Sequence, residues 1–213
     1  MAGLDADGVV ADGVVADGSP IGAPFAPDGP PVIQIVPLKG LPFVGLALAF
    51  VIYAIASNST WALMFCHVAG GGMWTAVDLY VGLIVGPILG GLSPPARAEF
   101  SARFMPKMVL LMPTVVMMTL AAGFQIAVNF GNLLPGTVNR PWIVVSMVVV
   151  GIMAVIALGM LEPANIAVLF EMRKARPDGE VIERLMRRFV YTAGITGLMQ
   201  IATLVIMTRV ATQ

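Results

Sequence analysis

Five long apolar stretches follow one another from Ile35 onward, and they constrain the fold more than any other feature of the chain. They cover about residues 41–56, 61–83, 108–128, 142–161 and 189–207. A helix needs roughly 20 apolar residues to cross the ~30 Å hydrocarbon core of a bilayer, where each backbone polar group must be bonded within its own segment. Residues 35–213 are therefore predicted to form an all-α, polytopic transmembrane bundle of four to five membrane-spanning helices.

The composition excludes several classes of protein. Only 11% of the 213 residues are charged, whereas a soluble domain carries about 25%, so a soluble single-domain enzyme is excluded. Twelve acidic and twelve basic residues balance, with no basic stripe outside the apolar segments, so nucleic acid is not a partner. One cysteine, Cys66, and one histidine, His67, are too few for an intramolecular disulfide, a zinc site or a catalytic triad.

Residues 1–34 differ in composition from the rest of the chain. They are rich in Asp, Gly and Pro, and the pattern ADGVV recurs with a period of five between Ala6 and Gly18. Such a segment buries too little apolar area to offset the entropy lost on ordering. We predict that residues 1–34 are a low-complexity, disordered cytoplasmic tail in front of the bundle.

The lysines and arginines predict how the bundle is oriented. With five crossings and the N-terminus inside, ten of the twelve fall in inner segments, and Arg140 and Arg209 fall in outer ones. Because cytoplasmic loops carry the excess of basic residues, this bias predicts a multi-pass protein of the cell inner (plasma) membrane, with a cytoplasmic N-terminus and an external C-terminus. Trp61 and Trp142 lie at the predicted outer interface, where indole rings are favoured.

A further helical segment is predicted between the fourth and fifth crossings. Asp178 can cap its N-terminus, and Glu183 lies four residues before Arg187, the better order for an ion pair on a helix. We expect this segment to be the solvated start of the fifth crossing.

The second apolar stretch carries the residues that point to chemistry. His67, Gly71, Trp74 and Asp78 are spaced four, three and four residues apart, so they share one face of a helix. An ionisable residue near the bilayer centre costs about 2.5–3.5 kcal/mol, and such residues usually face the bundle interior and mark function. This face is therefore expected to point inward.

Polar side chains are also predicted within the membrane, namely Asp78, Gln125, Glu162 and Gln200. Counting helical turns puts Asp78 near the midplane with Thr119 and Gln200, and it puts His67 nearer the outer face with Gln125. Glu162 falls at the inner end of the fourth crossing, where it can meet Lys107 or Arg188. The alternative is that these groups only hydrogen-bond between helices, at about 0.6 kcal/mol each.

A haem b site is one hypothesis for His67. A neutral imidazole is a common ligand of haem iron, and a flat porphyrin needs small residues beside its ligand. Gly70 and Gly71 follow His67 closely, and Trp74 shares its face. A second axial ligand would be a methionine, water or His67 of a second chain. The competing interpretation is a histidine hydrogen-bonded across helices.

Copper is a less favoured cofactor at the same place. Thioether and thiolate sulfurs are soft ligands suited to Cu(I), and Met64, Cys66 and His67 lie close together in the sequence. Methionine is also an ordinary gap-filling residue of apolar cores, so this cluster can equally be packing.

Gly82, Gly86 and Gly90 are spaced four residues apart at the end of the second stretch. This small-residue spacing lets two helix backbones approach closely. We expect a neighbouring crossing or a second subunit to pack against it.

The residues between Trp61 and Gln125 resemble a known family. His67 is followed by Trp74, then by the pair Arg103 and Phe104 at the start of the next crossing, and by a small-residue ending at 119–123. This arrangement resembles the superfamily of copper-resistance D membrane proteins, which includes the bacterial membrane-type protoporphyrinogen oxidases. The resemblance implies a haem ligand at His67. The chain differs from the oxidases in lacking a second histidine and in carrying Asp78 where they have a basic residue.

The leading functional hypothesis is a membrane protein with a haem b or copper site in the outer half of its second helix, acting in redox or metal handling. The alternative is a non-catalytic accessory subunit of a larger membrane complex. Besides the lipid bilayer, the expected partners are a second copy of the chain or other membrane subunits. A proton-coupled transporter using Asp78 and Glu162 is the weakest hypothesis, because the sequence has no internal repeat.

Overall fold

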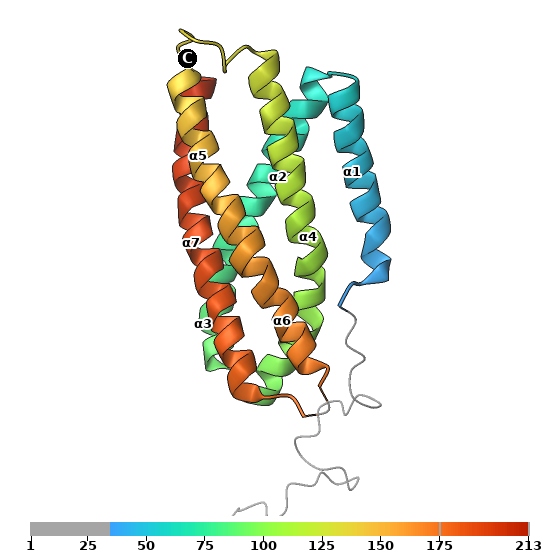
Figure 1. The fold of residues 1–213 in the computed structure, drawn as a ribbon. Coiled ribbons are helices and arrows are strands. Elements are labelled where there is room, and N and C mark those ends of the chain that lie inside the picture. Colours follow the sequence, from blue (N-terminus) through green and yellow to red (C-terminus); the bar gives the residue numbers. More distant parts are fainter. Residues whose placement is uncertain (1–34, 175, 213) are drawn as a thin grey trace, which may run out of the picture. The chain divides into compact units, whose positions relative to one another are not determined.

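The computed structural model of the protein describes residues 35–174 and 176–212, and its regular elements there are all helices. The predicted tail, residues 1–34, lies outside the described residues. Within the described part, five helical spans are long and apolar enough to cross a membrane, as predicted (Figure 1): Leu38–Ala56, Thr60–Gly91, Pro94–Asn129, Arg140–Met172 and Gly179–Ala211. The prediction of a multi-pass helical membrane bundle is confirmed.

The spans are divided into shorter elements. The first joins a 3-10 turn, η1 (Leu38–Gly40), to α1 (Leu41–Ala56). The second comprises α2 (Thr60–Tyr80), the π-helical segment η2 (Val81–Val85) and α3 (Gly86–Gly91). The third is α4 (Pro94–Asn129), and the fifth is α7 (Gly179–Ala211). The fourth comprises α5 (Arg140–Ile156), the π-helical segment η3 (Ala157–Leu161) and α6 (Glu162–Met172).

Asp178 caps α7 as predicted, since its carboxylate accepts hydrogen bonds from the backbone N–H groups of Glu180 and Val181. The helix then continues without a break to Ala211, so the segment after the fourth crossing is the start of the fifth. The predicted partner of Glu183 was wrong. Glu183 forms an ion pair at 3.2 Å with Arg97 of α4 instead of with Arg187, because α4 and α7 begin at the same end of the bundle (Figure 1).

The two π-helical segments arise in the same way. Each is followed, after one residue, by a proline: Pro87 after η2 and Pro163 after η3. Proline has no N–H, and its ring clashes with the carbonyl four residues earlier. Instead, the backbone forms π-type hydrogen bonds to the carbonyl five residues earlier. These run from the N–H of Gly86 to the oxygen of Val81 and from the N–H of Glu162 to the oxygen of Ala157. The helix therefore stays continuous past each proline.

The bundle consists of two helical hairpins and one additional helix. The span Thr60–Gly91 pairs with α4, and the span Arg140–Met172 pairs with α7, while α1 packs against α2 and α4 (Figure 1). The hairpins contact each other where α7 meets α2 and η2, and where α6 meets α4. Each hairpin begins with a helix containing a π segment and a proline. The two hairpins therefore share this local feature.

Glycines allow η2 and α3 to approach α7 closely. A Cβ on Gly82 would lie 2.6 Å from the Cα of Gly194 on α7, and a Cβ on Gly86 would lie 2.4 Å from the Val190 side chain. Gly90 differs, since a Cβ there would have no atom within 4 Å. Two of the three predicted packing glycines thus contact α7, and the neighbour is a crossing of the same chain.

Candidate functional site

His67 projects from the N-terminal half of α2 toward α4. Its Nδ1 lies 3.0 Å from the carbonyl oxygen of Thr119. A carbonyl only accepts hydrogen bonds, so Nδ1 carries the proton and donates, and Nε2 of the neutral ring is left as an unprotonated acceptor. A backbone carbonyl on the other ring nitrogen is the usual way in which proteins orient a metal-ligating histidine.

Gly123 provides the space for this ring. A Cβ built on Gly123 would lie 2.6 Å from both Cε1 and Nδ1 of His67. The imidazole therefore lies directly over the α4 backbone and is half-buried. Sequence reasoning missed Gly123, although its place one turn after Thr119 on a helix that must pack against α2 was the available signal.

The glycines that follow His67 contact α4 and leave little room for a flat ligand. A Cβ on Gly70 would lie 2.6 Å from Thr119 Oγ1, and a Cβ on Gly71 would lie 3.4 Å from Thr119 Cγ2. Trp74, next on the same face, is 2% exposed and belongs to the hydrophobic core. Gly72 faces outward, and a Cβ on it would have no atom within 4 Å. Gly72 lies about 140° from His67 around α2 at 3.6 residues per turn, so its open surface is not beside the imidazole.

The three residues considered for copper do not share one face of α2. Met64 is 42% exposed, whereas Cys66 is fully buried in a small cluster that includes Leu63 and Ala122. Among residues 35–174 and 176–212, no group of three or more His, Cys, Asp or Glu side chains is arranged to hold a metal ion. A copper site would need a rearranged Cys66.

Asp78 is the centre of a second polar site, deep in the bundle between α2 and α7. It is 2% exposed. Its Oδ2 accepts a hydrogen bond of 2.9 Å from Thr196 Oγ1 and one of 2.8 Å from Gln200 Nε2. The predicted neighbourhood of Asp78 and Gln200 is therefore present, whereas Thr119 contacts Gly70 two turns away.

Polar atoms around Asp78 are not fully paired. The Oε1 of Gln200 and the Nε1 of Trp74 are buried without a well-formed hydrogen bond among the described residues. Trp74 lies one helical turn before Asp78, so its indole N–H interacts with the carboxylate without reaching standard hydrogen-bond geometry. Buried polar atoms of this kind are rare in native proteins.

The other predicted intramembrane groups lie elsewhere. Gln125 donates to Asn58 and Asn129 in an exposed amide network where α4 meets the α1–α2 loop. Glu162 is half-buried beside Asn165, and within the described part of the chain it forms no ion pair with Lys107 or Arg188. Asn165 itself is fully buried, with both amide atoms unpaired among those residues. Glu162 and Gln125 therefore do not join either site.

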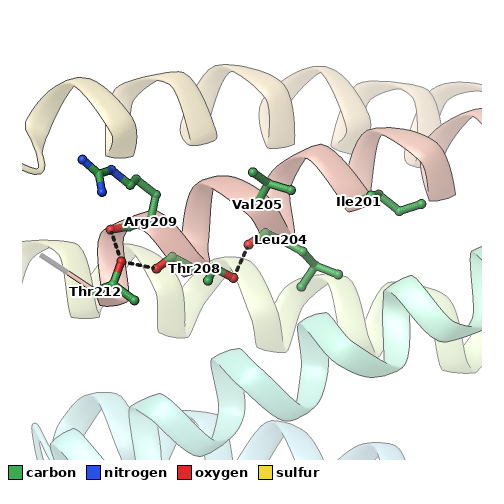
Figure 2. A pocket seen from close by; sticks show the side chains of 6 residues that line it. All are labelled: Ile201, Leu204, Val205, Thr208, Arg209 and Thr212. Atoms are coloured by element: carbon green, nitrogen blue, oxygen red, sulfur yellow. Dashed lines mark hydrogen bonds between the residues drawn. The ribbon is translucent and has the colours of Figure 1, made fainter.

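A depression of about 450 Å³ lies along the last turns of α7 (Figure 2). Ile201, Leu204 and Val205 form its apolar part. The hydroxyls of Thr208 and Thr212 donate to carbonyls of their own helix, at Leu204 and Thr208 (Figure 2). Arg209 also lines the depression, and no second charged side chain of the described residues joins it there, so these residues do not form a built ligand site (Figure 2).

Comparison with protein-family models, with curated proteins and with solved structures gives no match for this chain.

Proposed function

We propose that the protein is an integral membrane protein that binds haem b through Nε2 of His67 and acts in redox chemistry. The observation that carries the proposal is the bond from Nδ1 to the Thr119 carbonyl, which leaves Nε2 free to ligate. The resemblance of residues 61–125 to the copper-resistance D superfamily supports the same ligand. When bound, haem b supplies a one-electron carrier within the membrane.

The surrounding residues would hold one imidazole ligand for the haem iron. Gly123 and Thr119 hold the imidazole. A porphyrin would have to lie away from Gly70 and Gly71, since both contact α4. The second axial position would belong to water, a methionine or His67 of a second copy. Copper is less favoured, because Cys66 is fully buried while Met64 is exposed.

For the orientation, we propose that the junctions α3–α4 and α6–α7 face the cytoplasm of a cell with an inner (plasma) membrane. Arg97, Arg173, Lys174, Arg184 and Arg187 lie at or near these junctions. Cytoplasmic loops carry the excess of basic residues. His67 then lies in the outer half of the membrane, with the C-terminus outside.

The test is a reduced-minus-oxidised visible spectrum of the purified full-length protein, with iron, copper and haem content measured on the same sample. We expect an α band in the wild type that is lost in His67→Ala. Gly123→Ala should also weaken it, because the added Cβ would displace the imidazole. Gly72→Ala is the matched control and should retain full haem, since its Cβ meets no other atom. Equal haem content in wild type and His67→Ala, or none in either, would overturn the proposal.

A further inference from the structure

A membrane-facing groove of about 530 Å³ runs between the second span and α7. One wall is formed by η2 and α3, including Gly82, Gly86 and Gly90, and the other by α7 from Met186 to Leu198. Its volume falls in the range of about 300–1,000 Å³ that small-molecule sites occupy. The groove is separate from His67 and Asp78, neither of which lines it.

The polarity of the groove changes along its length. At the end near the α3–α4 junction it is lined by Arg97, Glu183 and Arg187, and toward the middle of the bundle by Leu83, Gly194 and Leu198. The distance from Arg187 to Leu198 along α7 is about 16 Å at 1.5 Å per residue. One leaflet contributes about 15 Å of hydrocarbon, half of the ~30 Å core. The groove therefore matches one lipid leaflet, with its charged end at the headgroup level.

The cations at this end differ in what they bind. Arg97 is held by the carbonyls of Leu89 and Leu92 and by the carboxylate of Glu183. Arg187 is exposed and forms no ion pair with any described residue. Tyr191 lies one turn further along α7, is 68% exposed and also lines the groove. A guanidinium and a phenol at this spacing can both donate to one phosphate group.

We propose that this groove binds one anionic phospholipid from the leaflet at the basic end of the bundle. Its phosphate contacts Arg187 and Tyr191, and one acyl chain lies along the glycines of η2 and α3. The charge of the mouth selects the occupant. Arg97 and Glu183 neutralise each other, and Arg187 remains as the uncompensated cation.

Gly90 allows the site to be blocked without disturbing the fold. It lines the groove, and a Cβ there would have no atom within 4 Å. Its neighbour Gly91 is equally open but does not line the groove. Gly90→Leu should therefore fill the groove, with Gly91→Leu as the matched control. Gly82 and Gly86 are unsuitable, because a side chain on either would push against α7.

The experiment is native mass spectrometry of the detergent-purified full-length protein titrated with dioleoyl phosphatidylglycerol or dioleoyl phosphatidylcholine at low salt. The wild type should bind the anionic lipid more tightly than the zwitterionic one. Arg187→Gln should lose about fivefold in affinity for phosphatidylglycerol, the change expected for one cation beside an anionic headgroup. Arg188→Gln changes the net charge equally but lies outside the groove, so it should stay within twofold of the wild type.

Gly90→Leu should abolish the preference for phosphatidylglycerol over phosphatidylcholine, and Gly91→Leu should retain that preference. Circular dichroism and size-exclusion profiles matching the wild type show that each variant is folded. Equal binding of both lipids by the wild type would overturn the proposal, as would a preference that survives both Arg187→Gln and Gly90→Leu. A wild-type dimer that Gly90→Leu converts to a monomer would assign the groove to a second copy of the chain and also overturn it.

Discussion

Gln200 of α7 donates a 2.8 Å hydrogen bond from Nε2 to the Oδ2 carboxylate oxygen of Asp78 on α2. The two residues are 122 positions apart in the chain, and both are buried where the two hairpins meet. This bond, with the one from Thr196, links the hairpins through polar groups in a region otherwise held by apolar contacts.

The Asp78–Gln200 bond predicts energetic coupling between the two residues. In a double-mutant cycle of Asp78→Ala and Gln200→Ala, the coupling energy should be at least about 0.6 kcal/mol, the average for hydrogen bonds between membrane helices. Unfolding of the purified protein in mixed detergent and SDS micelles measures it. The pair Asp78→Ala and Gln125→Ala should be additive within about 0.5 kcal/mol, since Gln125 belongs to a separate network. Equal coupling in both cycles would contradict this assignment.

Gly82 and Gly90 should respond differently to the same substitution. Gly82→Ala should lower the free energy of unfolding by about 1–3 kcal/mol, because its Cβ would lie 2.6 Å from the Cα of Gly194 and the helices must separate. Gly90→Ala should be neutral or stabilising by up to about 1 kcal/mol, since alanine is the better helix former and meets no other atom. The same unfolding assay tests both, and an equal loss of stability would show that Gly82 does not contact α7.

The tautomer of His67 can be measured directly. The chain has one histidine, so ¹⁵N-labelled histidine gives a single ring in solid-state NMR of the reconstituted protein. We expect a protonated Nδ1 and an unprotonated Nε2, because Nδ1 donates to the Thr119 carbonyl. Gly123→Ala should shift the Nδ1 signal and Gly72→Ala should not. A protonated Nε2 in the apo protein would remove the basis for ligation at that atom.

The orientation can be tested with single cysteines in a Cys66→Ala background, because Cys66 is the chain's one cysteine. Ser57 in the α1–α2 loop and Ser93 between α3 and α4 are both exposed. In intact cells, a membrane-impermeant maleimide should label Ser57→Cys and spare Ser93→Cys until the membrane is opened. The reverse pattern would place the basic junctions outside and refute the positive-inside assignment. Wild-type Cys66 should react only after denaturation, because it is fully buried.

Much of the fold followed from local features of the sequence. The stretch predicted at 41–56 coincides with α1, and Asp178 caps α7 as expected. Hydropathy and capping depend on residues close together in the sequence. They can therefore be recognised without knowing which helices pack against the segment. The third span begins at Pro94, well before the apolar stretch at 108–128, because its first turns carry charged residues. The second and fourth spans also extend beyond their apolar stretches, each past a proline. The π segments carry both helices past Pro87 and Pro163.

The candidate site was only partly predictable. The helical period put His67, Trp74 and Asp78 on one face, and depth counting paired Asp78 with Gln200. Neither argument could identify the hydrogen-bond partner of His67. That partner is a backbone carbonyl, and any residue type at position 119 would supply one. Gly123 was also missed. Its spacing from Thr119 was visible in the sequence, but its role depends on where the imidazole lies.

The sequence by itself determined that this is a helical membrane protein with four to five crossings, because in a bilayer each helix must satisfy its own backbone hydrogen bonds. The structure has five helices long and apolar enough to cross. The tertiary structure decided which side chains meet, because contacts between membrane helices depend on crossing points and rotations that no single segment specifies. For that reason Glu183 pairs with Arg97, and Gly82 and Gly86 contact α7 while Gly90 stays open. The crossing of α2 and α7 likewise brings the Gln200 amide to the buried Asp78 carboxylate.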